Sequence, residues 1–260
     1  MKVELKTITP TDAAKMLELN TSNRPANFHH VKRLASQMTA GRWRVNGDTI
    51  CMNGSCLIDG QHRLLAIIES GCTIETLVVE GISSDAFNTK DIGKRRSAAD
   101  TLAVNGEVSC KSLAATLTTI DRYMTNRMDR KVRYENNEVE ELLKKYPGAR
   151  KSVNVCRSTK GLVQPSILSA CHFLFSQKDE DAANEFIDGV LHGRNLSEGD
   201  PEYTLRERLL KNSLSSSKMA PMSIAAIIIK AWNAKRLGAK IKMLRFFEAG
   251  DKPETFPVVQ

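Results

Sequence analysis

Apolar residues recur at helical spacing in two stretches near the start of the chain. Residues 29–40 and 61–70 both carry them every three or four positions, and a glycine follows each stretch, as at many helix ends. Residues 10–20 fit a shorter helix. Residues 74–82 instead contain three consecutive apolar side chains, which is typical of a buried strand. The first hundred residues are therefore predicted to mix helices and strands.

A β-hairpin is predicted between these elements. Two β-prone segments in DTICMNGSCLIDG, residues 48–60, flank Asn53-Gly54, a strong signal for a two-residue turn. Such a turn would place Cys51 and Cys56 directly opposite each other. Two small residues on one face of the hairpin, or a redox pair, both fit this expectation.

Beyond about residue 107 the pattern becomes almost entirely helical. A further short helix, capped by Ser97, is expected just before it. Residues 224–229 are apolar nearly all round, which predicts a central core helix with Trp232 buried. The terminal segment 241–257 is expected to add a strand or an extended arm. The predicted helices cover 109–126, 136–146, 164–177, 179–192, 202–211 and 221–237. We therefore predict an α+β fold, with a small mixed sheet in residues 1–105 and an α-helical domain in residues 106–260.

Composition and charge indicate which class of binding partner to expect. The 260 residues include 41% hydrophobic and 26% charged side chains, as in ordinary folded proteins. The net charge of +8 and pI of about 9.2 favour an anionic partner such as DNA or a nucleotide, although a basic protein without a polyanion remains an alternative. No run approaches the ~18 apolar residues of a membrane span, and the six cysteines form no CxxC pair. A cytoplasmic protein with no membrane partner is expected.

The most informative stretch is Asp59-Gly60-Gln61-His62-Arg63, where the predicted hairpin meets a predicted helix. The first N–H groups of a helix have no internal partner and attract anions. Gly60 would let the backbone turn tightly, while His62 and Arg63 would add donors for phosphate oxygens. Asp59 could hold a metal, accept a hydroxyl proton or cap the helix. An ordinary capped helix start fits the same residues.

LIDGQHRLLAIIESG, followed by the apolar LVV, resembles the ParB/sulfiredoxin superfamily. Gly60–Arg63 stand where ParB-type proteins carry Gly-Glu-Arg-Arg and sulfiredoxins Gly-Cys-His-Arg; the free serine kinase branch carries Asp-Gly-His-His-Arg. The upstream NRPANFHHVKRLASQMTAGRWRVNGDTI, with FNTKDIGKRRSAADTL and IKAWNA, resembles ParB-like proteins of phages and mobile elements.

The resemblance implies a ParB/sulfiredoxin-like domain over residues 1–105 that binds a nucleoside triphosphate, ATP or CTP. Gly60, Gln61, His62 and Arg63 would hold phosphates, and Asp59 and His62 are the candidate catalytic residues. Phosphoryl transfer also needs a metal held by carboxylates, so Asp59 with Asp48 is a candidate Mg²⁺ site. No cysteine lies between Leu57 and Ile68, so sulfinic-acid reduction is not expected. His62 replaces the second arginine of the ParB turn, which leaves nucleotide switching open.

Other basic residues are candidates for contacts with phosphate or nucleic acid. Arg24 lies before a predicted helix and could reach a phosphate, or its loop could simply position that helix. Trp43 would either stack on a base or pack in the core. The candidates for nucleic-acid contacts are Arg42 and Arg44 on either side of Trp43, and the run Lys94, Arg95 and Arg96.

Two classes of function compete. One is a phosphotransferase, a kinase acting on a hydroxyl group such as that of a modified DNA base. The other is a non-catalytic DNA-binding adaptor or nucleotide-switched regulator of phage or plasmid origin. A nuclease is a third reading, for which the sequence offers no second metal cluster. DNA and a nucleotide are the expected partners, and a homodimer is a further expectation.

Overall fold

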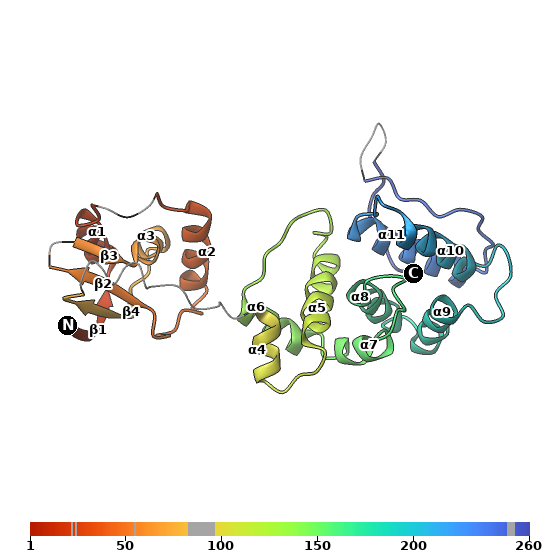
Figure 1. Cartoon of the computed structure of the whole chain (residues 1–260), viewed down its shortest axis with the longest axis horizontal. Coiled ribbons are helices and arrows are strands. Elements are labelled where there is room, and N and C mark those ends of the chain that lie inside the picture. The colour runs from red at the N-terminus through yellow and green to blue at the C-terminus, as the bar shows by residue number, and fades with distance from the viewer. Residues whose placement is uncertain (22, 24, 55, 83–96, 249–252) are drawn as a thin grey trace. The chain divides into compact units, whose positions relative to one another are not determined.

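In a computed structural model, residues 1–21, 23, 25–54, 56–82, 97–248 and 253–260 can be described. The chain divides into two compact units, Met1–Lys94 and Arg95–Gln260, called here the N-terminal unit and the helical unit. The described residues form eleven helices and one four-stranded sheet, so the α+β class is confirmed (Figure 1). The division falls about ten residues before the boundary expected at 105/106, because α4 (Ala98–Val104) packs against helices of the second unit.

The sheet of the N-terminal unit has the order β1-β4-β2-β3. β1 (Lys2–Ile8) runs antiparallel to β4 (Ile74–Glu80), which runs parallel to β2 (Thr49–Asn53), and β3 (Cys56–Asp59) closes the hairpin with β2. β1 was not predicted, because its apolar Val3 and Leu5 alternate with charged residues and remain more than half exposed. The predicted strand in 74–82 is confirmed as β4.

Three helices pack together in the N-terminal unit: α1 (Pro10–Glu18), α2 (Phe28–Thr39) and α3 (Gln61–Ser70). All three were predicted. α1 begins with a reciprocal capping box between Thr9 and Asp12, and α3 ends at Gly71 in the left-handed conformation. The core beneath them contains Ile50, Leu57, Leu64 and Val78. Burial of these side chains fixes the β3–α3 connection in place.

The hairpin has a different register from the one expected. Asn53 pairs with Cys56 and Cys51 pairs with Asp59, with an irregularity between Cys51 and Met52. The expectation that Cys51 and Cys56 lie directly opposite each other is therefore wrong. It assumed that Asn53 belongs to the turn, whereas Asn53 is the last paired residue of β2. Both cysteines are free thiols.

The helical unit consists of α4 and seven further helices. Its core surrounds Trp232, whose ring stacks on Phe175 with centroids 4.4 Å apart and meets Phe186 edge-on. The prediction of a central helix with a buried Trp232 is confirmed. The further helices are α5 (Cys110–Met124), α6 (Asn136–Lys145), α7 (Ala149–Val155), α8 (Pro165–Ser176), α9 (Glu180–His192), α10 (Pro201–Leu214) and α11 (Pro221–Arg236). Only α7 was not predicted.

The described residues after α11 form an extended arm and no strand. At its end the Trp232 indole N–H donates to the Gln260 carbonyl at 2.9 Å, and the Val259 N–H donates to the Tyr123 hydroxyl at 2.8 Å. Val259 is buried. The expected extended arm is thus a packed part of the helical unit. None of the helices among the described residues is both long enough and apolar enough to span a bilayer.

Candidate functional site

The β3–α3 turn depends on a glycine. Gly60 has φ of +106°, in the left-handed region that L side chains avoid. A Cβ atom at this position would lie 3.1 to 3.3 Å from atoms of Ile50 on β2. Gly60 therefore permits both the backbone conformation and the close approach of the helix start to the sheet.

The start of α3 is open to an anion from its backbone. The N-cap residue Gly60 provides no side-chain cap, and the helix dipole adds partial positive charge at this end. Arg63 lies in the first turn with a side chain that is only 14% exposed. The combination is typical of anion-binding helix starts.

Asp59 is engaged within the turn itself. One carboxylate oxygen accepts the Gly60 N–H at 2.7 Å, and the other accepts from the Arg63 guanidinium at 3.3 Å. Arg63 is four residues after Asp59, so the ion pair also orients the cation along the helix start. Asp59 thus has a structural role that needs no chemistry.

Gln61 serves the interior of the unit. Its side chain is buried and accepts from the Asn20 amide at 3.1 Å. Asn23 in turn donates to the Asn20 side chain and to the Leu57 carbonyl. These bonds fasten the loop after α1 to the β3–α3 connection. The Gln61 side chain is thus occupied by this interior contact.

His62 joins the starts of two helices. Its Nε2 accepts the N–H of Asn27, the residue whose side chain caps α2, at 3.0 Å. The His62 and His30 rings lie 5.2 Å apart, and Arg33 donates to His30 Nδ1 at 2.9 Å. A ring nitrogen that accepts a hydrogen bond is unprotonated, so Arg63 and Arg33 supply the positive charge here.

The tentative metal pair, Asp48 and Asp59, is not brought together by the hairpin. Asp59 is opposite Cys51, and Asp48 lies three residues along the chain from Cys51, a distance of roughly 10 Å in extended backbone. Asp48 is exposed, and its carboxylate accepts from Asn46. Within the described residues no group of three or more His, Cys, Asp or Glu side chains could hold a metal ion.

The other candidates for phosphate or nucleic-acid contacts either interact within the protein or lie outside the described residues. Arg44 donates to the carbonyls of Gly41 and Trp43, so it stabilises its own turn. Trp43 packs against the core of the N-terminal unit, although its buried indole N–H has no acceptor among the described residues. Arg42 is half-buried and engaged in an interaction. Arg24 and the run Lys94, Arg95 and Arg96 lie outside the described residues.

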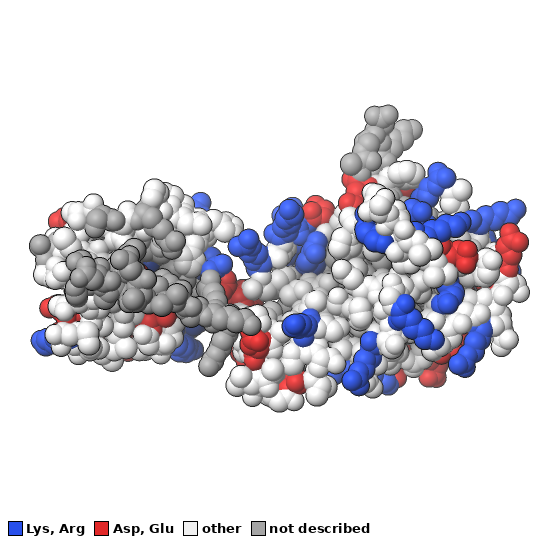
Figure 2. Space-filling model, in the orientation of Figure 1, with Lys and Arg blue, Asp and Glu red and all other residues white. Residues whose placement is uncertain are grey.

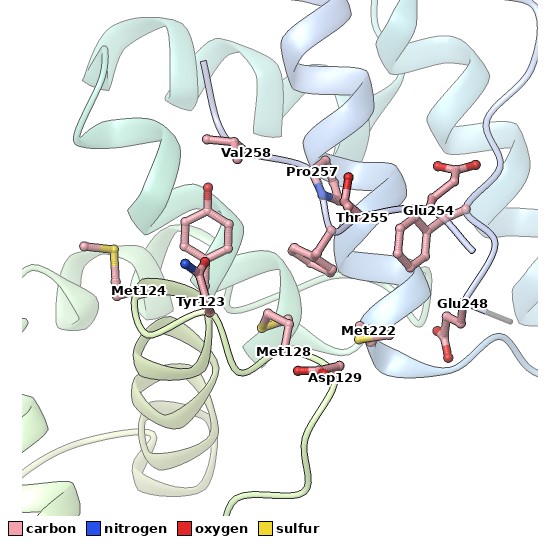
Figure 3. Close-up of a pocket in the computed structure, with 13 residues that line it drawn as sticks. Tyr123, Met124, Met128, Asp129, Met222, Glu248, Glu254, Thr255, Pro257 and Val258 are labelled. Atoms are coloured by element: carbon pink, nitrogen blue, oxygen red, sulfur yellow. The ribbon is translucent and has the colours of Figure 1, made fainter. Parts of the chain in front are cut away.

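A cavity in the helical unit was missed at the sequence level. It is a pocket of about 670 Å³ that is open to solvent on one side, between α5, the start of α11 and the terminal arm (Figure 3). Methionines 124, 128 and 222 line it with Tyr123 and Phe256, and Asp129, Glu248 and Glu254 also line it. Three carboxylates disfavour a phosphate ligand, so the turn at Gly60 remains the candidate anion site. The lining comes from segments more than a hundred residues apart, which no local pattern could reveal.

Comparisons with protein-family models, with curated proteins and with the solved structures find no match to this chain.

Proposed function

We propose that the N-terminal unit binds the phosphates of a nucleoside triphosphate at the β3–α3 turn, in a protein that acts on or near DNA. The observation that carries this proposal is Gly60, a left-handed residue pressed against Ile50 that opens α3 without a side-chain cap. The resemblance of LIDGQHRLLAIIESG to the ParB/sulfiredoxin phosphate turn supports the same reading. The net charge of +8 supports DNA as the second partner.

The neighbouring helix start adds to the proposed site. Asn27 begins α2 and is hydrogen-bonded to His62, so two positive helix ends lie side by side. Arg63 is held in one orientation by Asp59, and a pre-oriented guanidinium loses little entropy when it binds a phosphate.

A divalent ion carried by the triphosphate would find one carboxylate at the turn, that of Asp59. Mg²⁺ is commonly bound through one or two carboxylates together with substrate phosphates, so the turn fits a metal of this kind. Asp48 contributes nothing to this fit, for the reason of register given above.

The engagement of Asp59 favours the non-catalytic form of the proposal. Both oxygens of Asp59 accept hydrogen bonds from the turn, so the role seen for this carboxylate is to position Gly60 and Arg63. Nucleotide binding by a switch or adaptor needs this positioning and no proton transfer.

The test compares a ligand series on the full chain. Calorimetric titrations with ATP, CTP, AMP and adenosine should show affinity that rises with phosphate number, because the turn contacts phosphates. Equal affinity for adenosine and ATP would contradict the proposal. Incubation of the protein with γ-labelled nucleotide, Mg²⁺ and hydroxymethylated DNA then distinguishes the catalytic form of the proposal from the non-catalytic one. Transfer of labelled phosphate to the DNA that is lost in Asp59→Asn would identify a kinase.

A further inference from the structure

A groove of about 620 Å³ lies in the helical unit, between α10 and the segment that follows α11. The Thr204 hydroxyl fixes the two walls together by donating to the Ile241 carbonyl at 2.7 Å. The lining residues of α10 are spaced three or four apart, so they form one face of the helix. They are Thr204, Glu207, Arg208 and Lys211.

Four cationic side chains line this groove: Arg208 and Lys211 from α10, and Lys242 and Arg245 from the opposite wall. All four are exposed, and none has an ion pair with any carboxylate of the described chain. Other cations of this unit are paired, such as Arg236 with Asp179 and Lys240 with Asp200.

The excess of positive charge extends along the groove. Among the described lining residues Glu207 is the one carboxylate, against four cations, and Glu248 accepts from Ser223. Figure 2 shows Lys and Arg side chains gathered over α10 and the chain beside it. Unpaired cations on both walls repel one another, so a polyanion that enters the groove relieves this repulsion.

The spacing of the charges fits a chain of phosphates better than a single one. Arg208 and Lys211 are separated by roughly 4.5 Å along the axis of α10. Lys242 and Arg245 are separated by up to about 10 Å of extended chain. Hydrophobic side chains accompany them, because Phe247 is 50% exposed and Met243 61% exposed at the same wall. An exposed aromatic ring beside a basic groove provides a stacking surface for an unpaired base.

We propose that this groove binds single-stranded nucleic acid, with Arg208, Lys211, Lys242 and Arg245 along the phosphate backbone and Phe247 stacked on a base. In a duplex the faces of each base are stacked on the neighbouring base pairs, so duplex DNA could not use Phe247 in this way. The site is separate from the phosphate turn at Gly60. Either site can therefore fail its test while the other stands.

The test measures the fluorescence anisotropy of a labelled oligothymidine of about 20 nucleotides with the full chain. The double variant Lys211→Ala/Lys242→Ala removes two groove cations. The matched control, Lys111→Ala/Lys144→Ala, removes two exposed and unpaired lysines from α5 and α6. Both doubles lower the net charge equally, so their comparison separates the groove from bulk charge.

The groove variant should bind oligothymidine about tenfold more weakly at 0.1 M salt, and its logarithmic salt slope should fall by about 1.4. The control should change affinity less than about twofold. Phe247→Ala should weaken binding more than Phe247→Leu, since leucine retains an apolar surface. All variants should keep the wild-type melting temperature, because the replaced side chains are exposed.

Equal losses in the two lysine doubles would overturn the proposal, as would the absence of oligothymidine binding. Tighter binding of a duplex of the same length would assign the groove to double-stranded DNA instead. Competition by polyglutamate as effective as that by unlabelled oligothymidine would assign it to acidic peptides. Titration of the same variants with ATP reports the phosphate turn independently.

Discussion

Single residues decide whether the β3–α3 turn can form. The pair Asp59-Gly60 before a helical pattern was enough to predict a tight turn, because only glycine accepts such backbone at no cost. The contact of Gly60 with Ile50 could not be predicted, since it depends on how α3 packs on β2. The ion pair between Asp59 and Arg63 agrees with their spacing of four residues in the sequence. The hydrogen bond between Gln61 and Asn20 could not be predicted, because the two residues are far apart in the sequence.

Gly60→Ala should destabilise the N-terminal unit more than Gly71→Ala does. Both glycines have positive φ, and alanine costs about 1–2 kcal/mol in that conformation. At Gly71 the new methyl group meets nothing within 4 Å, whereas at Gly60 it presses on Ile50 and adds about 1–3 kcal/mol of overpacking. Hydrogen exchange of the α3 amides measures the difference. Equal protection in the two variants would show that the contact with Ile50 relaxes freely.

The two tryptophans should respond differently to replacement by phenylalanine. The buried indole N–H of Trp43 has no acceptor, so Trp43→Phe removes an unsatisfied donor and should change the free energy of unfolding by less than about 1 kcal/mol. Trp232→Phe breaks the bond to the Gln260 carbonyl and reduces the stack on Phe175, and should cost about 2 kcal/mol or more. Denaturant unfolding followed by circular dichroism ranks the two. A larger loss for Trp43→Phe would mean that its indole has a partner.

At the scale of elements, a buried histidine links three helices. His172 of α8 is fully buried, with Nδ1 at 2.9 Å from the Ser152 hydroxyl of α7 and Nε2 at 3.0 Å from the Asn184 side-chain oxygen of α9. The Asn184 oxygen requires a donor, so the neutral ring carries its proton on Nε2 and accepts from Ser152. Burial lowers the pKa of His172 below its ordinary value of 6.5.

The stability of the helical unit should therefore fall as the pH drops below about 6.5. The unfolded chain takes up a proton at His172 near that pH, whereas the folded chain does not until its lower pKa is reached, so acid favours unfolding. The slope contributed by one such group is at most about 1.4 kcal/mol per pH unit. The hydrogen bond from Lys151 lowers the pKa of the neighbouring Glu180 carboxyl, so Glu180 does not account for this slope.

Denaturant titrations of the wild type, His172→Gln and the exposed-site control His29→Gln between pH 7 and 5 measure this slope. His172→Gln should be less stable than the wild type at pH 7, but its free energy of unfolding should change less with pH. His29→Gln should show the same pH dependence as the wild type. Parallel curves for all three proteins would contradict the linkage.

Element prediction succeeded where one physical signal was strong. Periodic apolar residues located every long helix, and glycine marked the end of α3. β1 was not predicted because Val3 and Leu5 alternate with charged residues and remain exposed, so the strand has no buried apolar face apart from Ile8. The hairpin register also failed, since Asn-Gly favours a turn but pairing across the strands decides which residues belong to it.

At the scale of the whole molecule, the two proposed binding sites belong to different units. The N-terminal unit contains a helix start with Arg63 and no side-chain cap, and the helical unit contains a groove whose four cations have no ion pair with a described carboxylate. The overall basic charge predicted an anionic partner without indicating where it binds. The groove proposed here could be found only in the folded structure, because its two walls come from segments about thirty residues apart.

The central claim is that phosphates bind at the β3–α3 turn through Arg63. The most direct measurement is a calorimetric titration of the wild type, Arg63→Gln and Arg44→Gln with ATP and with CTP. Arg44→Gln is the matched control, because both arginines belong to the N-terminal unit and each substitution removes one positive charge. Arg63→Gln should lower the affinity for the more tightly bound of the two nucleotides by at least about tenfold. This corresponds to the loss of one charge-assisted contact of about 1.4 kcal/mol. Arg44→Gln should change its affinity less than about twofold. Equal affinities for wild type and Arg63→Gln would contradict the account.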